Sequence, residues 1–336
     1  MRRTIVAAIT LALLVGACGD KKKTVAARPK ATTTTTIPAV FPLTGLPVND
    51  TEAAARPALT VKVENAPESR PQAGLEAADV VYEEQVEGGL TRFLAMFQST
   101  DSELVGPIRS LRPTDPEVVR PFGGLFAYSG GTKKFIDMLH ATPLQDIGFD
   151  TMPQLYDKRR DKEAPHHIYS STEKLYGAAK EGLKPPPPLS PFVPAGQPFA
   201  PTAPPAVHLS VPIGRTAADY DWDAAAAGWK RTTNGTPHLV EGGAQLTSTN
   251  VIVQFVTYRN SPGDFDVLRN PVSVANVLGT GDAWVLAGGK VVKGKWSKAS
   301  PEAVTTFTDA AGAPVALLPG RTWVLLTPVG AAAATR

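Results

Sequence analysis

The segment 79–112, DVVYEEQVEGGLTRFLAMFQSTDSELVGPIRSLR, constrains the fold of this chain more than any other stretch of its sequence. Apolar and polar residues alternate on both sides of Gly88-Gly89, which is typical of strands that bury one face. A two-residue glycine loop supplies the positive φ angles that tight hairpin turns require. The segment therefore predicts two antiparallel strands joined at Gly88-Gly89.

A two-residue loop also sets the register of the hairpin, in which Gln85 would lie opposite Arg92 and Glu83 opposite Leu94. Period-two alternation then gathers the polar side chains on one face, namely Glu83, Gln85, Glu87 and Arg92. The apolar side chains share the other face, namely Val80, Tyr82, Val86, Phe93 and Phe97. We predict that the apolar face is core and that the polar face is open to a ligand.

Further charged residues follow the hairpin. Arg109 and Arg112 lie in GPIRSLR, and His166 lies in the charged loop DKRRDKEAPHHIY. Guanidinium groups bind carboxylates and phosphates bidentately, so the predicted ligand is anionic or sugar-like. The predicted ligand-binding residues are Glu83, Glu87, Arg92, Arg109, Arg112 and His166. The alternative is a structural ion-pair network, which charged clusters in non-catalytic domains also form.

Catalysis and metal binding have little support in the sequence. Glu83 and Glu87 are separated by about 13 Å if they lie on one strand, because each residue rises by about 3.3 Å. A glycosidase pair needs a separation of about 5 to 9 Å. His166 and His167 point in opposite directions in an extended segment, no HExxH spacing is present, and no serine lies in a GxSxG elbow. We predict no catalytic residue, no metal and no cofactor.

The first 18 residues, MRRTIVAAITLALLVGAC, predict an export signal. Two arginines precede an apolar run that is shorter than the roughly 20 residues of a membrane-spanning helix. Val15-Gly16-Ala17-Cys18 resembles a bacterial lipobox, in which the cysteine is lipidated and becomes the mature N-terminus. Cys18 is the only cysteine, which excludes intrachain disulfides. We predict a lipid anchor at Cys18 and a location on the extracytoplasmic face of the cell membrane.

Composition changes along the chain predict its domain organisation. Residues 19–42 are rich in threonine, lysine and proline and predict a disordered tether. Residues 43–183 mix strand and helix signals, and 184–205 form a linker that holds many of the 32 prolines. Residues 206–329 show short strands and turns without helical spacing, which indicates a mainly antiparallel β domain, and 330–336 predict a frayed tail. The predicted fold class is α+β.

Net charge argues against a nucleic-acid partner. The formal charge of +3 becomes +1 when a leader containing Arg2 and Arg3 is removed (3 − 2 = 1). A nucleic-acid-binding surface would need a clustered excess of lysine and arginine. The expected partners are the membrane, through the lipid anchor, and a cell-wall or protein component of the envelope.

Several motifs together carry a family resemblance, among them ADVVYE, EGGLTR, GPIRSLR, APHHIYSS, GTGDAWVLAGGKVVKGKW and PGRTWVLLTP. They resemble the YerB-like bacterial lipoproteins, a group described as domain of unknown function 3048 with N- and C-terminal parts. The resemblance covers residues 43–328 and implies an envelope lipoprotein whose biochemical role is not established. The chain departs from the family pattern at His166-His167, where the family has His-Asn.

Three functions follow from these observations. We favour a membrane-anchored extracytoplasmic lipoprotein that binds an envelope ligand or partner through its Glu/Arg/His face. The first alternative is an enzyme of cell-wall or glycan metabolism that uses the same carboxylates. The second alternative is a purely structural envelope lipoprotein.

Overall fold

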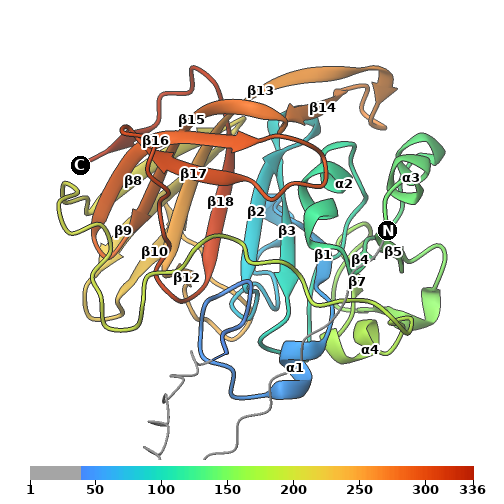
Figure 1. Cartoon of the computed structure of the whole chain (residues 1–336). Helices are drawn as coiled ribbons and strands as arrows, with labels where there is room; N and C mark the ends of the chain where they lie inside the picture. Colours follow the sequence, from blue (N-terminus) through green and yellow to red (C-terminus); the bar gives the residue numbers. More distant parts are fainter. Residues whose placement is uncertain (1–38) are drawn as a thin grey trace, which may run out of the picture. The chain divides into compact units, whose positions relative to one another are not determined.

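The computed structural model describes residues 39–336 (Figure 1). The predicted leader, the lipidation site Cys18 and most of the predicted tether lie outside the described residues. Within them, mixed β-sheets predominate and the helices are few and short, in agreement with the α+β class at this level. None of the described helices has the length and apolar character needed to cross a membrane.

Strands from both halves of the chain build one large sheet. The first half supplies β1 (Leu59–Glu64), β2 (Val80–Gln85), β3 (Thr91–Phe97), β4 (Leu125–Ala127) and β5 (Gln145–Asp146). The second half supplies β13 (Asn250–Phe265), β14 (Pro271–Asn276), β15 (Gly279–Ala287), β16 (Lys290–Lys298), β17 (Thr306–Asp309) and β18 (Thr322–Pro328). The order is β17-β16-β15-β13-β18-β2-β3-β1-β4-β5, with β14 paired to β13.

The two halves meet where β18 pairs in parallel with β2, from Thr322 opposite Val80 to Leu325 opposite Glu83. Parallel central strands are normally apolar on both faces because other elements cover both sides of the sheet. Every residue of β1 and β3 is buried, as are all but the last of both β2 and β18. The sheet is thus continuous across the expected linker 184–205, while the domain boundaries themselves stay a prediction.

A smaller sheet takes the order β11-β10-β9-β8-β19, with β12 paired to β10. Its strands are β8 (His208–Ile213), β9 (Thr216–Asp223), β10 (Gly228–Thr233), β11 (Thr236–Pro237), β12 (Thr247–Ser248) and β19 (Ala334–Thr335). A third sheet pairs β6 (Asp157–Lys158) with β7 (Ile168–Tyr169). The tail 330–336, for which fraying is predicted, contains β19, which pairs with β8.

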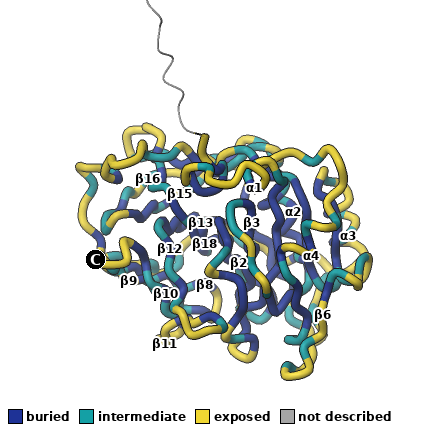
Figure 2. The backbone as a smooth tube through the Cα atoms, turned by 90° about the horizontal axis from the view of Figure 1, so that it is seen from below, coloured by how far each residue is buried: buried dark blue, intermediate teal, exposed yellow. Residues whose placement is uncertain are grey.

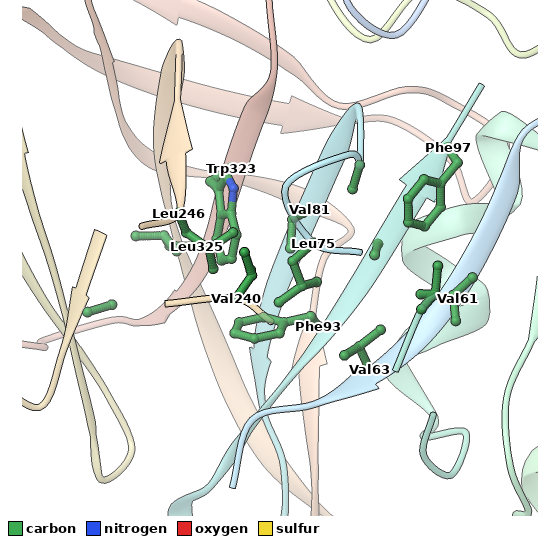
Figure 3. Close-up of a cluster of buried hydrophobic side chains, with 14 of the residues drawn as sticks. Val61, Val63, Leu75, Val81, Phe93, Phe97, Val240, Leu246, Trp323 and Leu325 are labelled. Atoms are coloured by element: carbon green, nitrogen blue, oxygen red, sulfur yellow. The ribbon is translucent and has the colours of Figure 1, made fainter. Parts of the chain in front are cut away.

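The core lies on both faces of the large sheet. Between the two larger sheets, Phe93 and Trp323 meet edge to face, and Val81, Val240 and Leu325 lie around them (Figure 3). Figure 2 shows buried backbone (dark blue) around β2 and β3 in the interior. Two buried faces leave no side of the hairpin strands open to solvent.

The helices of the described residues are α1 (Thr51–Ala55), α2 (Thr114–Val119), α3 (Lys133–His140) and α4 (Thr172–Tyr176). Helices α2 and α3 cover part of the second face, whereas α4 packs through Leu175 on the face of Phe93. Four short 3-10 turns accompany them, namely η1 (Pro67–Ser69), η2 (Glu87–Gly89), η3 (Arg120–Phe122) and η4 (Pro153–Leu155). Apolar side chains of α2 and α3, including Val119 and Phe135, pack with Leu94 and Met96 of β3.

The predicted hairpin forms, but the predicted register of its strands is wrong by one residue. The loop contains three residues, 87–89, because the N–H of Val86 donates to the carbonyl of Leu90 (2.8 Å). Gly88 and Gly89 both have positive φ (64° and 74°), which favours glycine. Glu84, not Gln85, therefore lies opposite Arg92, and Glu83 lies opposite Phe93. A one-residue slip changes which face the partners share, so Glu83 and Arg92 lie on opposite faces of the sheet.

Candidate functional site

A pocket of about 220 Å³ lies at the end of β2 and β3 beside η2. Four segments enclose it: the end of β1, the hairpin turn, the loop before α2 and the tip of the β13–β14 hairpin. Its lining residues are Glu64, Ala66, Val86, Glu87, Leu90, Thr91, Arg92, Arg109, Ser110, Arg112, Asp266, Val267 and Leu268. We call this cavity the arginine pocket, because three guanidinium groups line it.

Arg112 is neutralised by the turn of the hairpin. Its Nη2 donates to Glu87 Oε2 (2.8 Å), and its Nε donates to Glu87 Oε1, so the pair is bidentate. Its backbone N–H donates to Asp115 Oδ2 (2.7 Å), which holds the loop against the start of α2. A bidentate pair at a half-buried position fixes both side chains.

Arg109 is held less tightly. Its Nε lies 2.8 Å from Glu64 Oε1, but the two groups are not aligned as a hydrogen bond. The other oxygen of Glu64 lies 2.7 Å from His166 Nδ1, so one carboxylate serves two partners. The terminal nitrogens of Arg109 make no hydrogen bond to any other residue that the structure describes. They are available to a ligand in the pocket.

Arg92 lacks a carboxylate partner within the described part of the chain. Its side chain is buried, with 8% of the residue exposed, and its Nη1 donates to the carbonyl of Ser110 (2.9 Å). Burial, with the cations of Arg112 and Arg109 nearby, lowers the pKa of Arg92 below its usual range. The floor of the pocket thus holds three guanidinium groups and two carboxylates, Glu64 and Glu87.

A third carboxylate, Asp266, belongs to the β13–β14 loop and is occupied within it. Its Oδ1 accepts from the N–H groups of Leu268 (2.9 Å) and Asn270 (2.8 Å). Its Oδ2 accepts from the side-chain amide of Asn270 (3.0 Å). Asp266 shapes the loop at the pocket mouth and does not pair with Arg92.

The structure brings together most of the predicted site residues but not all of them. Glu87, Arg92, Arg109 and Arg112 line the arginine pocket, and His166 reaches it through Glu64. Glu83 is excluded, because it lies on the other face of the sheet and is fully buried. The predicted placement of Glu83 beside Arg92 is wrong because the three-residue turn shifts the register.

Glu83 belongs to a sealed network that joins the two larger sheets. Arg231 of β10 pairs with it (Nη1 to Oε2, 2.9 Å), and Thr91 Oγ1 donates to its Oε1 (2.8 Å). The guanidinium carbon of Arg231 lies 4.8 Å from the ring centroid of Trp323 and 5.3 Å from that of Tyr220. For Glu83, the structural ion-pair interpretation is the one that fits.

His238 extends this network. Its Nδ1 lies 3.1 Å from Arg231 Nε, and its Nε2 lies 2.8 Å from Gln72 Oε1. Nδ1 accepts and Nε2 donates, so the geometry requires the neutral ring. Burial, followed by the charges of Arg231 and Arg70, lowers the pKa of His238 well below its usual value.

A second sealed cluster lies on the same face of the sheet as Arg92. Lys62 Nζ donates to Glu84 Oε1 (2.5 Å) and to Asp115 Oδ1 (2.7 Å), and all three residues are fully buried. Burial raises the pKa of Glu84; Lys62 opposes the rise and Asp115 adds to it. The cluster has no access for a ligand.

The pocket offers little for catalysis beyond the His166–Glu64 pair. Ser110 lines the pocket, but its hydroxyl donates to the carbonyl of Ser129 (3.0 Å), away from any base. Among the described residues, no group of three or more histidine, cysteine, aspartate or glutamate side chains is placed to hold a metal. The arrangement of charges suits binding of an anion.

Sequence reasoning missed several residues of these clusters. Glu64 is the last residue of β1, and its charge at the strand end was the available signal. Asp266, Val267 and Leu268 come from a hairpin far along the chain, and no local pattern connects them to Arg92. Arg231 gives no signal either, because its partner Glu83 lies in the other half of the sequence.

Two family models match successive parts of this chain. Residues 43–184 match the model "Protein of unknown function (DUF3048) N-terminal domain", and residues 208–324 match the corresponding C-terminal domain. The Bacillus subtilis (strain 168) protein named "Putative lipoprotein YerB" is 27% identical over 305 residues, which cover 85% of this chain and 86% of that protein. The crystal structure of YerB protein from Bacillus subtilis has a TM-score of 0.75 at 25% identity, covering 89% of this chain and 99% of that chain.

Proposed function

Since this chain belongs to the DUF3048 family of proteins of unknown function, we propose its role from its own pocket: it is a membrane-anchored envelope lipoprotein that binds an anionic ligand. The ligand is a phosphate- or carboxylate-bearing component of the cell wall or of a partner protein. The observation that carries the proposal is Arg92, a buried guanidinium without a carboxylate partner among the described residues.

The energetic argument starts from the cost of a buried charge. Taking an ion out of water costs several kcal/mol unless a counter-charge or hydrogen bonds replace its hydration. Arg92 makes one hydrogen bond within the described residues and lies beside the cations of Arg112 and Arg109. The carboxylates of Glu87 and Glu64 are also near, but they pair with Arg112 and Arg109 instead. A bound anion would supply the missing counter-charge, and Arg109 could reach it with its terminal nitrogens. We therefore expect an anion to bind where it can pair with Arg92.

The anchor rests on two supports, the lipobox-like Val15-Gly16-Ala17-Cys18 and the name of the Bacillus subtilis relative. One short lipidated segment followed by a polar tether would hold the folded part at the extracytoplasmic face. Cys18→Ala should move the chain from the membrane fraction to the soluble fraction. Retention in the membrane would contradict the anchor.

Ligand binding is tested with the full chain in phosphatidylcholine nanodiscs, titrated calorimetrically with the anionic and neutral fractions of a soluble cell-wall digest. We expect the wild type to bind the anionic fraction, and Arg92→Gln to bind it at least tenfold more weakly, about 1.4 kcal/mol. Arg120→Gln is the matched control, because Arg120 pairs with Glu302 away from the pocket. Equal weak binding by all three proteins would support a purely structural role instead.

A further inference from the structure

The mouth of the arginine pocket is lined by exposed apolar side chains. Val267 is 97% exposed and Leu268 is 78% exposed, and both lie at the tip of the β13–β14 hairpin. Leu90, from the turn of the β2–β3 hairpin, faces the same pocket and is also exposed. Large exposed apolar side chains that gather at one place mark an interaction site more often than scattered ones do.

The loop that presents these side chains has a defined conformation. Asp266 accepts hydrogen bonds from the backbone of Leu268 and Asn270, which turns Val267 and Leu268 outward. Below the tip, Lys134 of α3 pairs with Asp264 (2.5 Å), and Figure 1 shows the hairpin (orange) reaching over the α2 region. The apolar tip is therefore held in place beside the charged floor.

The floor and the mouth differ in chemistry. On the floor, Arg92 and Arg109 line the cavity, and their guanidinium groups can bind an anion. At the mouth, Leu90, Val267 and Leu268 expose apolar surface to water, and covering that surface with a hydrocarbon is favourable. The backbone N–H of Arg215 donates to the carbonyl of Gly89 (2.7 Å), which places another arginine next to the turn. A small hydrophilic anion would use only the floor.

We propose that the arginine pocket takes an anionic amphiphile, with its charged head on Arg92 and Arg109 and its hydrocarbon along Leu90, Val267 and Leu268. This inference rests on the proposed anion binding and adds the chemical class of the ligand. Each additional buried methylene strengthens such binding, so affinity should rise with the length of the chain attached to the anion.

The test compares methyl phosphate, hexyl phosphate and hexanol, titrated calorimetrically into the full chain in phosphatidylcholine nanodiscs, with empty nanodiscs as the blank. We expect hexyl phosphate to bind at least tenfold more tightly than methyl phosphate, and hexanol to show no saturable binding. The double variant Val267→Ser/Leu268→Ser should lose the tenfold advantage and keep the affinity for methyl phosphate. Val207→Ser, at an exposed valine of the segment before β8, is the matched control and should change neither affinity.

The outcomes separate the two proposals. Equal affinity for methyl and hexyl phosphate, with both lost in Arg92→Gln, would overturn the amphiphile and leave anion binding in place. An advantage for hexyl phosphate that survives in the double variant would also overturn it. Failure of every phosphate to bind, with the anionic wall fraction still bound, would overturn the amphiphile and leave anion binding in place; failure of both would overturn anion binding as well.

Discussion

Two charged clusters lie side by side on one face of the central sheet, and they differ in access and in balance. Lys62 and Glu84 form the sealed cluster with Asp115, while Arg92, directly opposite Glu84 in the hairpin, belongs to the arginine pocket. Asp115 connects them, since one oxygen binds Lys62 and the other accepts from the N–H of Arg112. In the sealed cluster Lys62 pairs with both carboxylates, whereas in the pocket Arg92 pairs with no carboxylate of the described residues.

The comparison separates charged residues that stabilise the fold from charged residues that we propose bind a ligand. In the sealed cluster, Lys62 is the cation that both buried carboxylates share, so its removal should affect folding. In the arginine pocket, Arg92 has no acid, so its removal should affect binding and leave folding nearly unchanged. The following predictions test this difference, from the largest expected effect to the smallest.

Lys62→Met should lower the free energy of unfolding by about 3 to 5 kcal/mol, because it leaves Glu84 and Asp115 buried together without their cation. Urea denaturation of wild type and variant measures the difference. Lys298→Met is the matched control: Lys298 is also buried, but its Nζ donates only to the carbonyl of Glu117, so the loss should be about 1 kcal/mol. Equal losses in both variants would show that Lys62 acts as an ordinary buried lysine.

His238, in the sealed network around Glu83 and Arg231, should make stability fall in mild acid. Its folded pKa lies well below the unfolded value of 6.5, so below pH 6.5 the unfolded chain binds a proton that the folded protein does not. Stability is therefore lost as the pH falls from 7 to 5.5, by about 1 kcal/mol from this group. In His238→Gln, the difference between the unfolding free energies at pH 7 and pH 5.5 should be smaller by about 1 kcal/mol than in the wild type. An unchanged difference would place the acid sensitivity elsewhere.

Arg92→Met should change the free energy of unfolding by less than about 1 kcal/mol, the smallest effect of the three. The variant loses one hydrogen bond to Ser110, but it also removes a buried cation that lies beside Arg109 and Arg112. Thermal and urea unfolding of the wild type and the variant both measure this change in the free energy of unfolding. A loss as large as that of Lys62→Met would mean that Arg92 has a structural role and would remove the contrast between the two clusters.

Local patterns predicted much of the secondary structure. Alternation on both sides of Gly88-Gly89 predicts two strands, and these are β2 and β3. The GPIRSLR motif placed Arg109 and Arg112 close to the hairpin, and both line the pocket with Glu87. These predictions succeed because periodicity and short sequence separation depend on neighbouring residues alone.

Other features could not be read from local pattern. The turn at Gly88-Gly89 is compatible with a loop of two or three residues, and the third residue moves Glu83 from the predicted site to the core. Arg231 and Asp266 enter their clusters only because strands of the second half join the sheet of the first half. Such contacts depend on pairing between distant segments.

The sequence by itself determined where strands and helices form and which short segment carries the arginines, since these depend on residue order over a few positions. Only the tertiary structure decided which acid neutralises which arginine. That choice depends on a one-residue register and on the parallel pairing of β18 with β2, which together seal Glu83 between the sheets and leave Arg92 facing a cavity.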